Sequence, residues 1–313
     1  MTIGLIVNYN GGVSLARCVA SLRHSDFGAR PLLIVDNGSR DGSARAIAAV
    51  AGVELLELPR NVGFATGANA GLRRLLEREA GSILLINPDT EVAPDFFAPL
   101  QRALEEGASI AGPKLVLPEL PEGRHRAKVP PRIWSAGGRV TFGRNLARLD
   151  GHRERDRGQH DVARDVSFLP ATVWLARRDL FREVGLFDEA FFCYVEDVDF
   201  CVRAVERGCR LRYEPRSRVV HEGSAASGGG YTPLRKYLNA AGGFRLLRKH
   251  GTAARWCRFL AGDVLTLPFA LVYAALRGRP DAALWKARGL VDGWRGRPFA
   301  GARRAALLPG DGA

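Results

Sequence analysis

The chain has 313 residues, of which 46% are hydrophobic and 25% are charged, and its formal net charge is +13. This ordinary globular composition excludes a disordered or fibrous protein and is enough for one large domain plus an appendage. Fifteen Lys and Arg against four Asp give residues 230–313 a net charge of +11, while the first 229 residues carry only +2. The basic character therefore belongs to a C-terminal appendage, where it indicates an anionic partner, either a membrane surface or a nucleic acid.

The cysteines and the start of the chain bear on the compartment. The five cysteines show no paired metal-ligand spacing, and an odd, scattered set is typical of a reducing compartment. Met1 leads directly into an apolar run without a basic stretch or a cleavage site, so we expect no signal peptide. Both features favour a cytoplasmic protein.

Four apolar runs near the start of the chain predict buried strands at 2–7, 31–35, 53–58 and 82–86. Between these runs, apolar residues recur at helical spacing, which predicts helices around 15–22, at 43–50 and around 72–76. Such alternation of strands and helices predicts an α/β fold with a mostly parallel central sheet.

Polar residues follow each of these strands: Asn8, Asp36, Asn61 and Asp89. Any one of them alone is more often a turn residue, because Asn, Asp and Gly favour turns. Open parallel sheets bind ligands at the carboxyl ends of their strands, so four such residues at one edge predict a nucleotide crevice. The chain has no Gly-x-Gly-x-x-Gly and no Gly-Lys-Ser/Thr motif, which indicates neither a dinucleotide fold nor a phosphate loop.

The middle of the chain has a weaker pattern. From residue 118 to 164 the periodicity fades, and Pro, Gly, Arg and His surround the isolated aromatic residues Trp134 and Phe142. Long irregular segments within a domain are usually functional, so we expect a loop over the site. We assign three histidines of this loop to solvent: His125, His152 and His160. Strands are predicted again at 166–176, 209–213 and 218–220, followed by a flexible link at 227–230.

Glu196, Asp197 and Asp199 fall in the first turn of a predicted amphipathic helix, in which apolar residues recur from Val198 and Gly208 closes the run. A single carboxylate there would only complement the helix dipole. Three carboxylates, preceded by aromatic residues that shield them from water, favour a functional site. Close carboxylates raise one another's pKa and the helix N-terminus lowers it, so the net direction stays open.

These residues resemble the inverting glycosyltransferases of family 2, which have the GT-A fold, and the bacterial rhamnosyltransferase-like branch is most similar. The resemblance covers about residues 1–224. It rests on the combined order and spacing of seven motifs: Val-Asn-Tyr-Asn at 7–10, Val-Asp-Asn-Gly-Ser-x-Asp-Gly-Ser at 35–43, Asn-x-Gly-Phe-x-x-Gly-x-Asn at 61–69, Asn-Pro-Asp at 87–89, Gly-Leu-Phe-Asp-Glu-x-Phe-Phe at 185–192, Glu-Asp-Val-Asp at 196–199, and His221. It implies a Rossmann-like catalytic domain over residues 1–226, followed by a helical appendage over 231–313.

The resemblance also implies the roles of individual residues. Asp36 would accept a hydrogen bond from the nucleobase. Asp89 and His221 would bind a divalent metal, Mg²⁺ or Mn²⁺, which neutralises the leaving diphosphate. Asp197 would be the base that deprotonates the acceptor hydroxyl for an inverting attack. Nine residues would line the nucleotide-sugar site, namely Val7, Asn8, Asn10, Asp36, Asn61, Gly63, Asn69, Asn87 and Asp89, and three would lie on the acceptor side, namely Glu196, Asp199 and Trp134.

Three departures from the family pattern concern the metal and the acceptor. The family's metal motif is Asp-x-Asp, and here its first position is Asn87, which weakens metal affinity or shifts one contact to water. Glu91 either compensates for this change or is a solvated loop residue. His221 would be read as structural without the resemblance. Residues 170–171 are Pro-Ala where relatives often have Gly-Ala beside the acceptor pocket.

The implied function is transfer of a sugar, such as rhamnose from a dTDP donor, to a lipid-linked or polysaccharide acceptor in cell-envelope glycan synthesis. A nucleotidyltransferase would use the same nucleotide crevice but release pyrophosphate. A nucleic-acid-binding protein would explain the basic tail, but the tail has no known binding motif and only sparse aromatic residues, so we expect no nucleic acid partner.

The appendage contains an apolar run at 259–276, interrupted by Asp263 and Pro268. The run is shorter than the ~20 residues that a spanning helix needs. Packing on the catalytic domain is one alternative. Apolar residues with basic flanks are typical of a helix that lies in a membrane interface, and seven basic residues flank this run: Arg245, Arg248, Lys249, Arg255, Arg258, Arg277 and Arg279. We therefore expect an enzyme at the inner face of the cytoplasmic membrane, bound to its anionic surface.

Overall fold

The computed structural model describes the whole chain except residues 119–129, 144, 224–231, 277, 279 and 309–313. Several features of the sequence analysis lie outside the described residues: His125, Arg277, Arg279, the link at 227–230 and the boundary between 226 and 231. All five cysteines lie in the described part, and none of them forms a disulfide.

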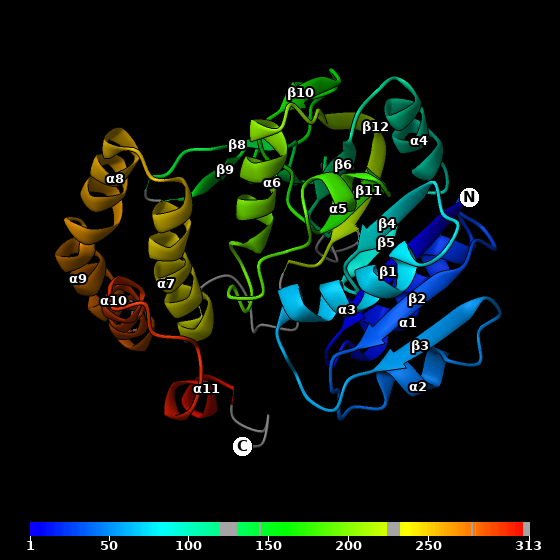
Figure 1. Cartoon of the computed structure of the whole chain (residues 1–313). Helices are drawn as coiled ribbons and strands as arrows, with labels where there is room; N and C mark the ends of the chain where they lie inside the picture. Colours follow the sequence, from blue (N-terminus) through cyan, green and yellow to red (C-terminus); the bar gives the residue numbers. More distant parts are fainter. Residues whose placement is uncertain (119–129, 144, 224–231, 277, 279, 309–313) are drawn as a thin grey trace, which may run out of the picture.

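A mixed sheet of ten strands forms the centre of the molecule (Figure 1). Its strands are β1 (Thr2–Asn8), β2 (Leu32–Asp36), β3 (Val53–Glu57), β4 (Ser82–Ile86), β5 (Thr90–Val92), β6 (Ile110–Val116), β7 (Ile133–Ser135), β10 (Arg164–Val166), β11 (Val173–Arg177) and β12 (Leu211–His221). The main order is β10-β12-β6-β11-β4-β1-β2-β3, while β5 pairs with β12 and β7 with β6. Two more strands, β8 (Gly138–Val140) and β9 (Ala147–Leu149), form a separate small sheet.

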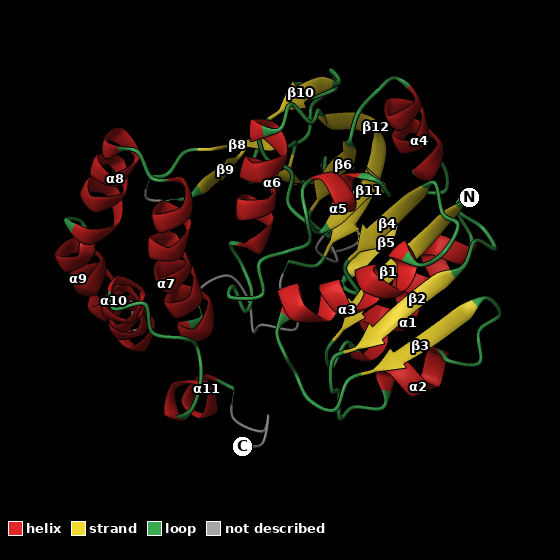
Figure 2. Ribbon diagram, viewed as in Figure 1, coloured by secondary structure: helices red, strands yellow, loops and turns green. Residues whose placement is uncertain are grey.

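Six helices belong to the part of the chain that carries the sheet: α1 (Gly12–Arg23), α2 (Ser43–Ile47), α3 (Phe64–Leu76), α4 (Phe97–Glu105), α5 (Leu180–Glu183) and α6 (Glu196–Glu206). The C-terminal helices gather on one side of it, next to α6 (Figure 2). They are α7 (Pro233–His250), α8 (Ala253–Phe259), the π-helical turn η2 (Leu260–Val264), α9 (Leu267–Leu276), α10 (Pro280–Trp294) and α11 (Ala302–Leu307).

The predicted α/β fold is confirmed. Strands β3, β2, β1 and β4 are parallel neighbours, as are β6 and β12, whereas β11 runs antiparallel between β4 and β6. Helices cover both faces: Leu5 of β1 shares a core with Leu72 of α3, and the adjacent Ile6 shares one with Leu15 of α1. Successive strand residues point to opposite faces, so burial on both sides explains the continuous apolar runs.

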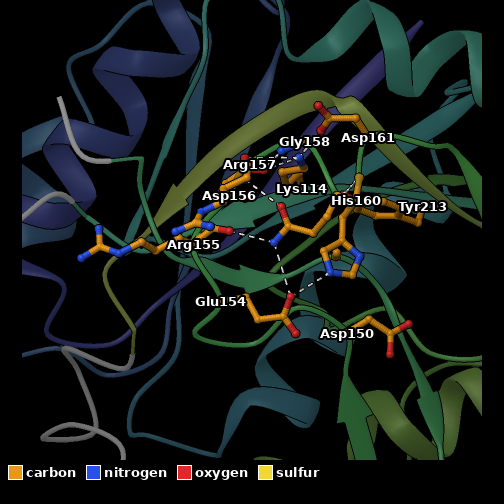
Figure 3. Close-up of polar contacts among 12 residues, drawn as sticks. Lys114, Asp150, Glu154, Arg155, Asp156, Arg157, Gly158, His160, Asp161 and Tyr213 are labelled. Carbon is orange, nitrogen blue, oxygen red and sulfur yellow. Dashed lines mark hydrogen bonds and ion pairs between the residues drawn. The ribbon is translucent and has the colours of Figure 1, made fainter.

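In its described residues, the segment from 118 to 164 has more regular secondary structure than the sequence analysis predicts. It contributes β7, β8 and β9, and a buried ion pair holds its second half on the sheet (Figure 3). Lys114 of β6 is fully buried, with its Nζ 3.0 Å from Asp156 Oδ1 and in contact with Asp161. A buried ammonium needs such partners, which fixes the loop that supplies them. His160 is half-buried with its Nε2 3.4 Å from Glu154 Oε2, so its prediction as a solvent residue is wrong.

Other predicted boundaries also change. The strands predicted at 209–213 and 218–220 are one strand, β12, whose pairing with β6 shifts register between Glu214 and Arg218. The strand predicted at 166–176 is the end of β10 and most of β11, separated by a turn. The helix α4 and the strand β6 were not predicted.

The apolar part of the appendage belongs to a longer helical run than expected. Residues Ala253–Leu276 form a helical run of 24 residues whose most apolar 18-residue window has a mean hydropathy of 1.8, and by length and composition this run is long and apolar enough to cross a membrane. The apolar run keeps its expected bounds of 259–276, but the helical run that contains it is longer, so helix length does not exclude a span.

Candidate active site

The carboxyl ends of β1 and β2 carry a hydrogen-bonded cluster. Asn8 and Asp36 are partners across the two strands, with Asn8 Nδ2 3.2 Å from Asp36 Oδ1. The same Nδ2 lies 3.1 Å from Ser39 Oγ and 3.0 Å from Ser43 Oγ. Asn8 Oδ1 is buried and has no hydrogen-bond partner in the described residues. The cluster fixes the Asp36 carboxylate at the strand end, where its other oxygen can accept from a ligand N–H.

The turn after β3 is built around Asn61. Its Oδ1 accepts hydrogen bonds from Gly63 N at 2.9 Å and from Asn37 Nδ2 at 3.2 Å. Gly63 has a φ of +88°, and a Cβ there would lie 2.4 Å from the carbonyl oxygen of Phe192, so this position requires glycine. Phe64 N donates to that same carbonyl at 2.7 Å. The turn is thereby joined to the segment that leads into α6.

Three other residues that were predicted to line the nucleotide-sugar site contribute to the fold around it. Val7 is buried at the end of β1. Asn10 Oδ1 accepts from Arg40 N at 2.9 Å, which holds the loop after β1 against the loop after β2. Asn69 is almost fully buried and exchanges two hydrogen bonds with the backbone of Phe187, at 2.8 and 3.0 Å. Asn69 therefore positions the segment that precedes α6 from within the core.

Strands β5 and β12 bring Asp89 and His221 together. His221 Nε2 lies 3.3 Å from Asp89 Oδ2, and both side chains are largely buried. The ring of Trp134 stands edge-on to the His221 imidazole, with 4.5 Å between centroids. Trp134, predicted for the acceptor side, thus lies against the predicted metal ligand. His152 is exposed, as predicted, and its Nδ1 lies 2.8 Å from the Trp134 carbonyl.

The Asp89–His221 pair fits a divalent metal that a ligand helps to hold. Two donor atoms at right angles on an ion ~2.1 Å away lie about 3 Å apart, close to the separation seen here. His221 Nδ1 is buried without a partner in the described residues. No group of three His, Cys, Asp or Glu with metal-site geometry occurs in the described chain. Glu91 lies 3.5 Å from Arg17 in a surface ion pair.

The predicted carboxylate helix is confirmed as α6. It starts after Tyr194, whose φ of +76° is uncommon for a bulky residue and turns the chain sharply into the helix. Glu196 is buried, and burial together with the charges of Asp197 and Asp199 raises its pKa well above the usual range. Burial also raises the pKa of Asp197, to about 6, against hydrogen bonds from the Ala171 and Val198 N–H groups and the charge of Arg235. Burial therefore disfavours a negative charge on both carboxyl groups, and each charge further disfavours the other.

Residues 171 and 172 connect Asp197 by hydrogen bonds to the sheet edge where the nucleotide site is predicted. Ala171 N donates to Asp197 Oδ2 at 3.3 Å, and the carbonyl of Thr172 accepts from Asn87 N at 2.9 Å. The half-buried carboxylate of Asp197 is therefore placed next to the strand end that carries Asn87 and Asp89. The Pro-Ala departure at 170–171 sits directly at this contact.

Asp199 differs from its neighbours, and its prediction on the acceptor side needs correction. It is fully buried and faces α7, with its carboxylate 2.8 Å from Arg203 Nε, 2.6 Å from Lys249 Nζ and 2.9 Å from His250 Nε2. Burial alone would raise its pKa, but the hydrogen bonds from His250 and Lys249 and the charges of Arg203 and Lys249 outweigh burial and lower it to about 2. Asp199 therefore anchors the C-terminal helices to α6 and has no surface for an acceptor.

Some residues of the site were not singled out from the sequence. Ser39 and Ser43 belong to the motif at 35–43, and their spacing from Asp36 was the signal that could have placed them beside Asn8. Arg304 of α11 donates to the carbonyl of Asn61, a contact across 243 residues that no local pattern reveals. Arg235 of α7 faces the ring of Tyr194 at 5.5 Å.

Most of the sequence of the sheet-bearing part of the chain matches a known family. The model of glycosyl transferase family 2 matches residues 5–185, more than half of the chain, and the chain belongs to this family. It is thus a glycosyltransferase with a GT-A-like fold rather than a nucleotidyltransferase.

Individual relatives agree with this assignment. The chain is 30% identical over 240 residues to "N-acetylglucosaminyl-diphospho-decaprenol L-rhamnosyltransferase" of Mycobacterium tuberculosis. The aligned region covers 71% of this chain and 76% of the relative. It is 26% identical over 230 residues to "dTDP-rhamnosyl transferase RfbF" of Shigella flexneri, covering 70% and 71%.

Solved structures share the fold at low identity. One is TarS 1-349 of S. aureus in complex with UDP-GlcNAc, at a TM-score of 0.55 and 16% identity, covering 98% of this chain and 84% of that one. Another is the mannosyltransferase PcManGT of Pyrobaculum calidifontis in complex with GDP-Man and Mn²⁺, at a TM-score of 0.54 and 16% identity, covering 98% and 78%.

Proposed function

We propose that this protein transfers rhamnose from dTDP-rhamnose, with inversion, to a lipid-linked sugar or growing polysaccharide in cell-envelope glycan synthesis. The bridge at residues 171–172 carries the proposal, because it sets a carboxylate base beside the strand ends that form the nucleotide site. The two rhamnosyltransferase relatives support the choice of sugar, and the name of the mycobacterial relative supports a diphospho-lipid acceptor.

The chain's own residues account for the chemistry. Asp36 accepts from an N–H of the nucleobase and fixes the donor. Asp197, ionised near neutral pH, takes the proton of the acceptor hydroxyl at a carboxylate oxygen. The hydroxyl oxygen then bonds to the anomeric carbon from the face opposite the nucleoside diphosphate, whose bond to that carbon breaks. Mg²⁺ or Mn²⁺ held by Asp89 and His221 would supply positive charge to the leaving diphosphate.

The C-terminal helices have features of a membrane-binding segment. Only 17% of the most apolar window of the helical run Ala253–Leu276 is buried inside the molecule, and its exposed apolar residues include Leu265, Phe269, Val272 and Leu276. The only acidic residue of this run, Asp263, is neutralised by Lys286 of α10 at 2.6 Å. An exposed apolar face with basic neighbours supports a helix lying in an anionic interface. We infer that the protein binds the inner face of the cytoplasmic membrane.

Flotation with vesicles tests the membrane proposal. Full-length protein should float with phosphatidylglycerol vesicles, be released by salt, and ignore phosphatidylcholine vesicles. The double variant Phe269→Ser and Leu276→Ser removes exposed apolar area without touching the catalytic residues, and should float less. Equal flotation of the variant and the wild type would contradict an apolar docking face.

A donor screen tests the proposed reaction. Purified protein is incubated with a diphospho-polyprenol-linked N-acetylglucosamine and a panel of nucleotide sugars, and release of nucleoside diphosphate is measured. We expect release with dTDP-rhamnose and a lipid product one sugar larger. Release of pyrophosphate, or transfer only from other donors, would contradict the proposal.

A further inference from the structure

A shallow crevice, with a cavity volume of only about 30 Å³, lies between the catalytic domain and the C-terminal helices. Three segments form its walls: residues 190–193, which lead into α6, the middle of α7, and the chain after α10. Aromatic and guanidinium groups dominate its lining, and we refer to it as the arginine crevice, defined by Arg245, Arg248, Arg297, Phe191, Phe192 and Phe299. None of its lining residues is acidic.

The positive charge of the arginine crevice is not balanced by the described residues around it. Arg245 faces the ring of Phe191 at 5.8 Å and forms no ion pair in the described chain. Arg248 donates to two backbone carbonyls, of Gly293 at 2.9 Å and of Trp294, so its charge also meets no carboxylate there.

The third guanidinium is only partly neutralised. Arg297 lies 3.5 Å from Asp292, but that carboxylate is buried behind the crevice. Asp292 also accepts from Arg303 at 3.1 Å and from the hydroxyl of Tyr237 at 3.1 Å. One carboxylate thus serves two arginines. The crevice therefore favours an anion, and guanidinium groups suit phosphate because they bind its oxygens in pairs.

Small residues and aromatic contacts create this crevice close to the catalytic base. A Cβ at Gly242 of α7 would lie 2.8 Å from Val195, so the helix approaches the segment before α6 closely. Phe192 contacts Phe299 with 5.0 Å between ring centroids, and its carbonyl binds the donor-side turn at Phe64. Cys193 in the wall is four residues before Asp197, a separation of at most about 14 Å. A sugar with its diphosphate spans a gap of that order.

The geometry points to the arginine crevice as the binding site for a lipid-borne diphosphate, which would hold the acceptor so that its sugar hydroxyl meets Asp197. The helix α10 that leads into one wall also packs against α9, whose apolar side chains are exposed. The inference rests on the proposed lipid-linked acceptor and adds the residues that recognise it. The same phosphate chemistry occurs in ordinary phospholipid headgroups, so the test separates the two sources.

Binding to vesicles tests the site without requiring sugar transfer. Full-length protein is titrated with phosphatidylcholine vesicles that contain polyprenyl diphosphate, and separately with phosphatidylglycerol vesicles. The main variant is Arg245→Ala, because Arg245 makes no hydrogen bond in the described chain whose loss would disturb the fold. Arg245→Lys keeps the charge but loses the paired N–H groups. Arg102→Ala on the distant, exposed helix α4 removes the same charge elsewhere.

We expect Arg245→Ala to weaken binding to the diphosphate vesicles at least tenfold, Arg245→Lys to weaken it less, and Arg102→Ala to leave it unchanged. Binding to phosphatidylglycerol vesicles should change less than twofold in all three. In the transfer assay the KM for the lipid acceptor should rise while donor affinity stays constant. Unchanged binding of Arg245→Ala to diphosphate vesicles would overturn the proposal, as would an equal loss with phosphatidylglycerol. If no donor gives transfer, the vesicle titration still decides this site.

Discussion

Replacing Asp197 or Asp199 by Asn is expected to change the stability of the protein in opposite directions. The two carboxylates belong to the same turn of α6, and each substitution removes one negative charge at nearly constant size. Asp197 sits beside the buried Glu196 with backbone N–H groups as its main partners, whereas Asp199 pairs with the cations of Arg203 and Lys249 and contacts the His250 imidazole.

Asp197→Asn is expected to stabilise the protein, because folding raises the pKa of Asp197. The carboxyl has a pKa of about 6 in the folded protein against its ordinary value of 3.8, so the folded state disfavours the charge. Stability is then highest below about pH 4 and falls as the pH rises to about 6. Two pKa units correspond to about 3 kcal/mol, and contact with solvent reduces this to roughly 1 to 2 kcal/mol. Asp197→Asn at pH 7.5 should therefore raise the Tm by about 2 to 8 °C.

Asp199→Asn is expected to destabilise the protein, because folding lowers the pKa of Asp199. Its pKa of about 2 lies below the unfolded value, so its contribution to stability is present above about pH 4 and is lost as the pH falls towards 2. Removing one partner of a buried ion pair typically costs about 3 to 5 kcal/mol. Asp199→Asn should lower the Tm at pH 7.5, and the loss should shrink in acid.

Thermal melts of both variants at pH 7.5 and 4.5, together with transfer rates at pH 7.5, test this reasoning. We expect Asp197→Asn to melt higher than the wild type at pH 7.5, to lose most of this gain at pH 4.5, and to transfer about 10² to 10⁴ times more slowly. A lower Tm of Asp197→Asn at pH 7.5, or near-normal turnover by this variant, would refute the assignment of Asp197 as a base with a raised pKa.

Three further predictions concern the same site. The acidic limb of the pH–rate profile should fall near pH 6 and move when Asp197 is replaced; a limb near pH 4 would contradict the raised pKa. Asp89→Ala and His221→Ala should each abolish the effect of Mn²⁺ on donor affinity in calorimetry, whereas identical binding in EDTA for the wild type would exclude a metal there. Gly63→Ala should destabilise the protein by about 1 to 3 kcal/mol and weaken donor binding, because its Cβ would collide with the Phe192 carbonyl; an unchanged melt would show that the turn relaxes.

Much of the fold was predictable because the buried strands are short and apolar. The runs that became β1, β2 and β4 are buried between helices on both faces, whereas the edge strand β3 is only half-buried, contrary to its prediction as a buried strand. Each of the four runs ends in a polar turn that the pattern marks. The strand β6 escaped prediction because Pro113 and the charged Lys114 interrupt its apolar pattern. Lys114 is tolerated there only because Asp156, more than forty residues later, pairs with it.

The candidate site was predictable where its residues follow strand ends, and less so where partners come from distant segments. Asn8 and Asp36 are direct neighbours, as the edge of a parallel sheet requires. The role of Asp199 could not be read locally, because Lys249 and His250 decide it from another helix. The contact of Arg304 with the donor-side turn depends on how α11 folds back, which periodicity does not determine.

The anomeric configuration of the product tests the central claim most directly. The wild-type enzyme is given dTDP-rhamnose and a diphospho-polyprenol-linked N-acetylglucosamine, and the new glycosidic bond is examined by NMR. A single base at Asp197 predicts a rhamnosyl product whose anomeric configuration is opposite to that of the donor, formed at a greatly reduced rate by Asp197→Asn. A product that keeps the donor's configuration, or one formed equally well by Asp197→Asn, would contradict the account.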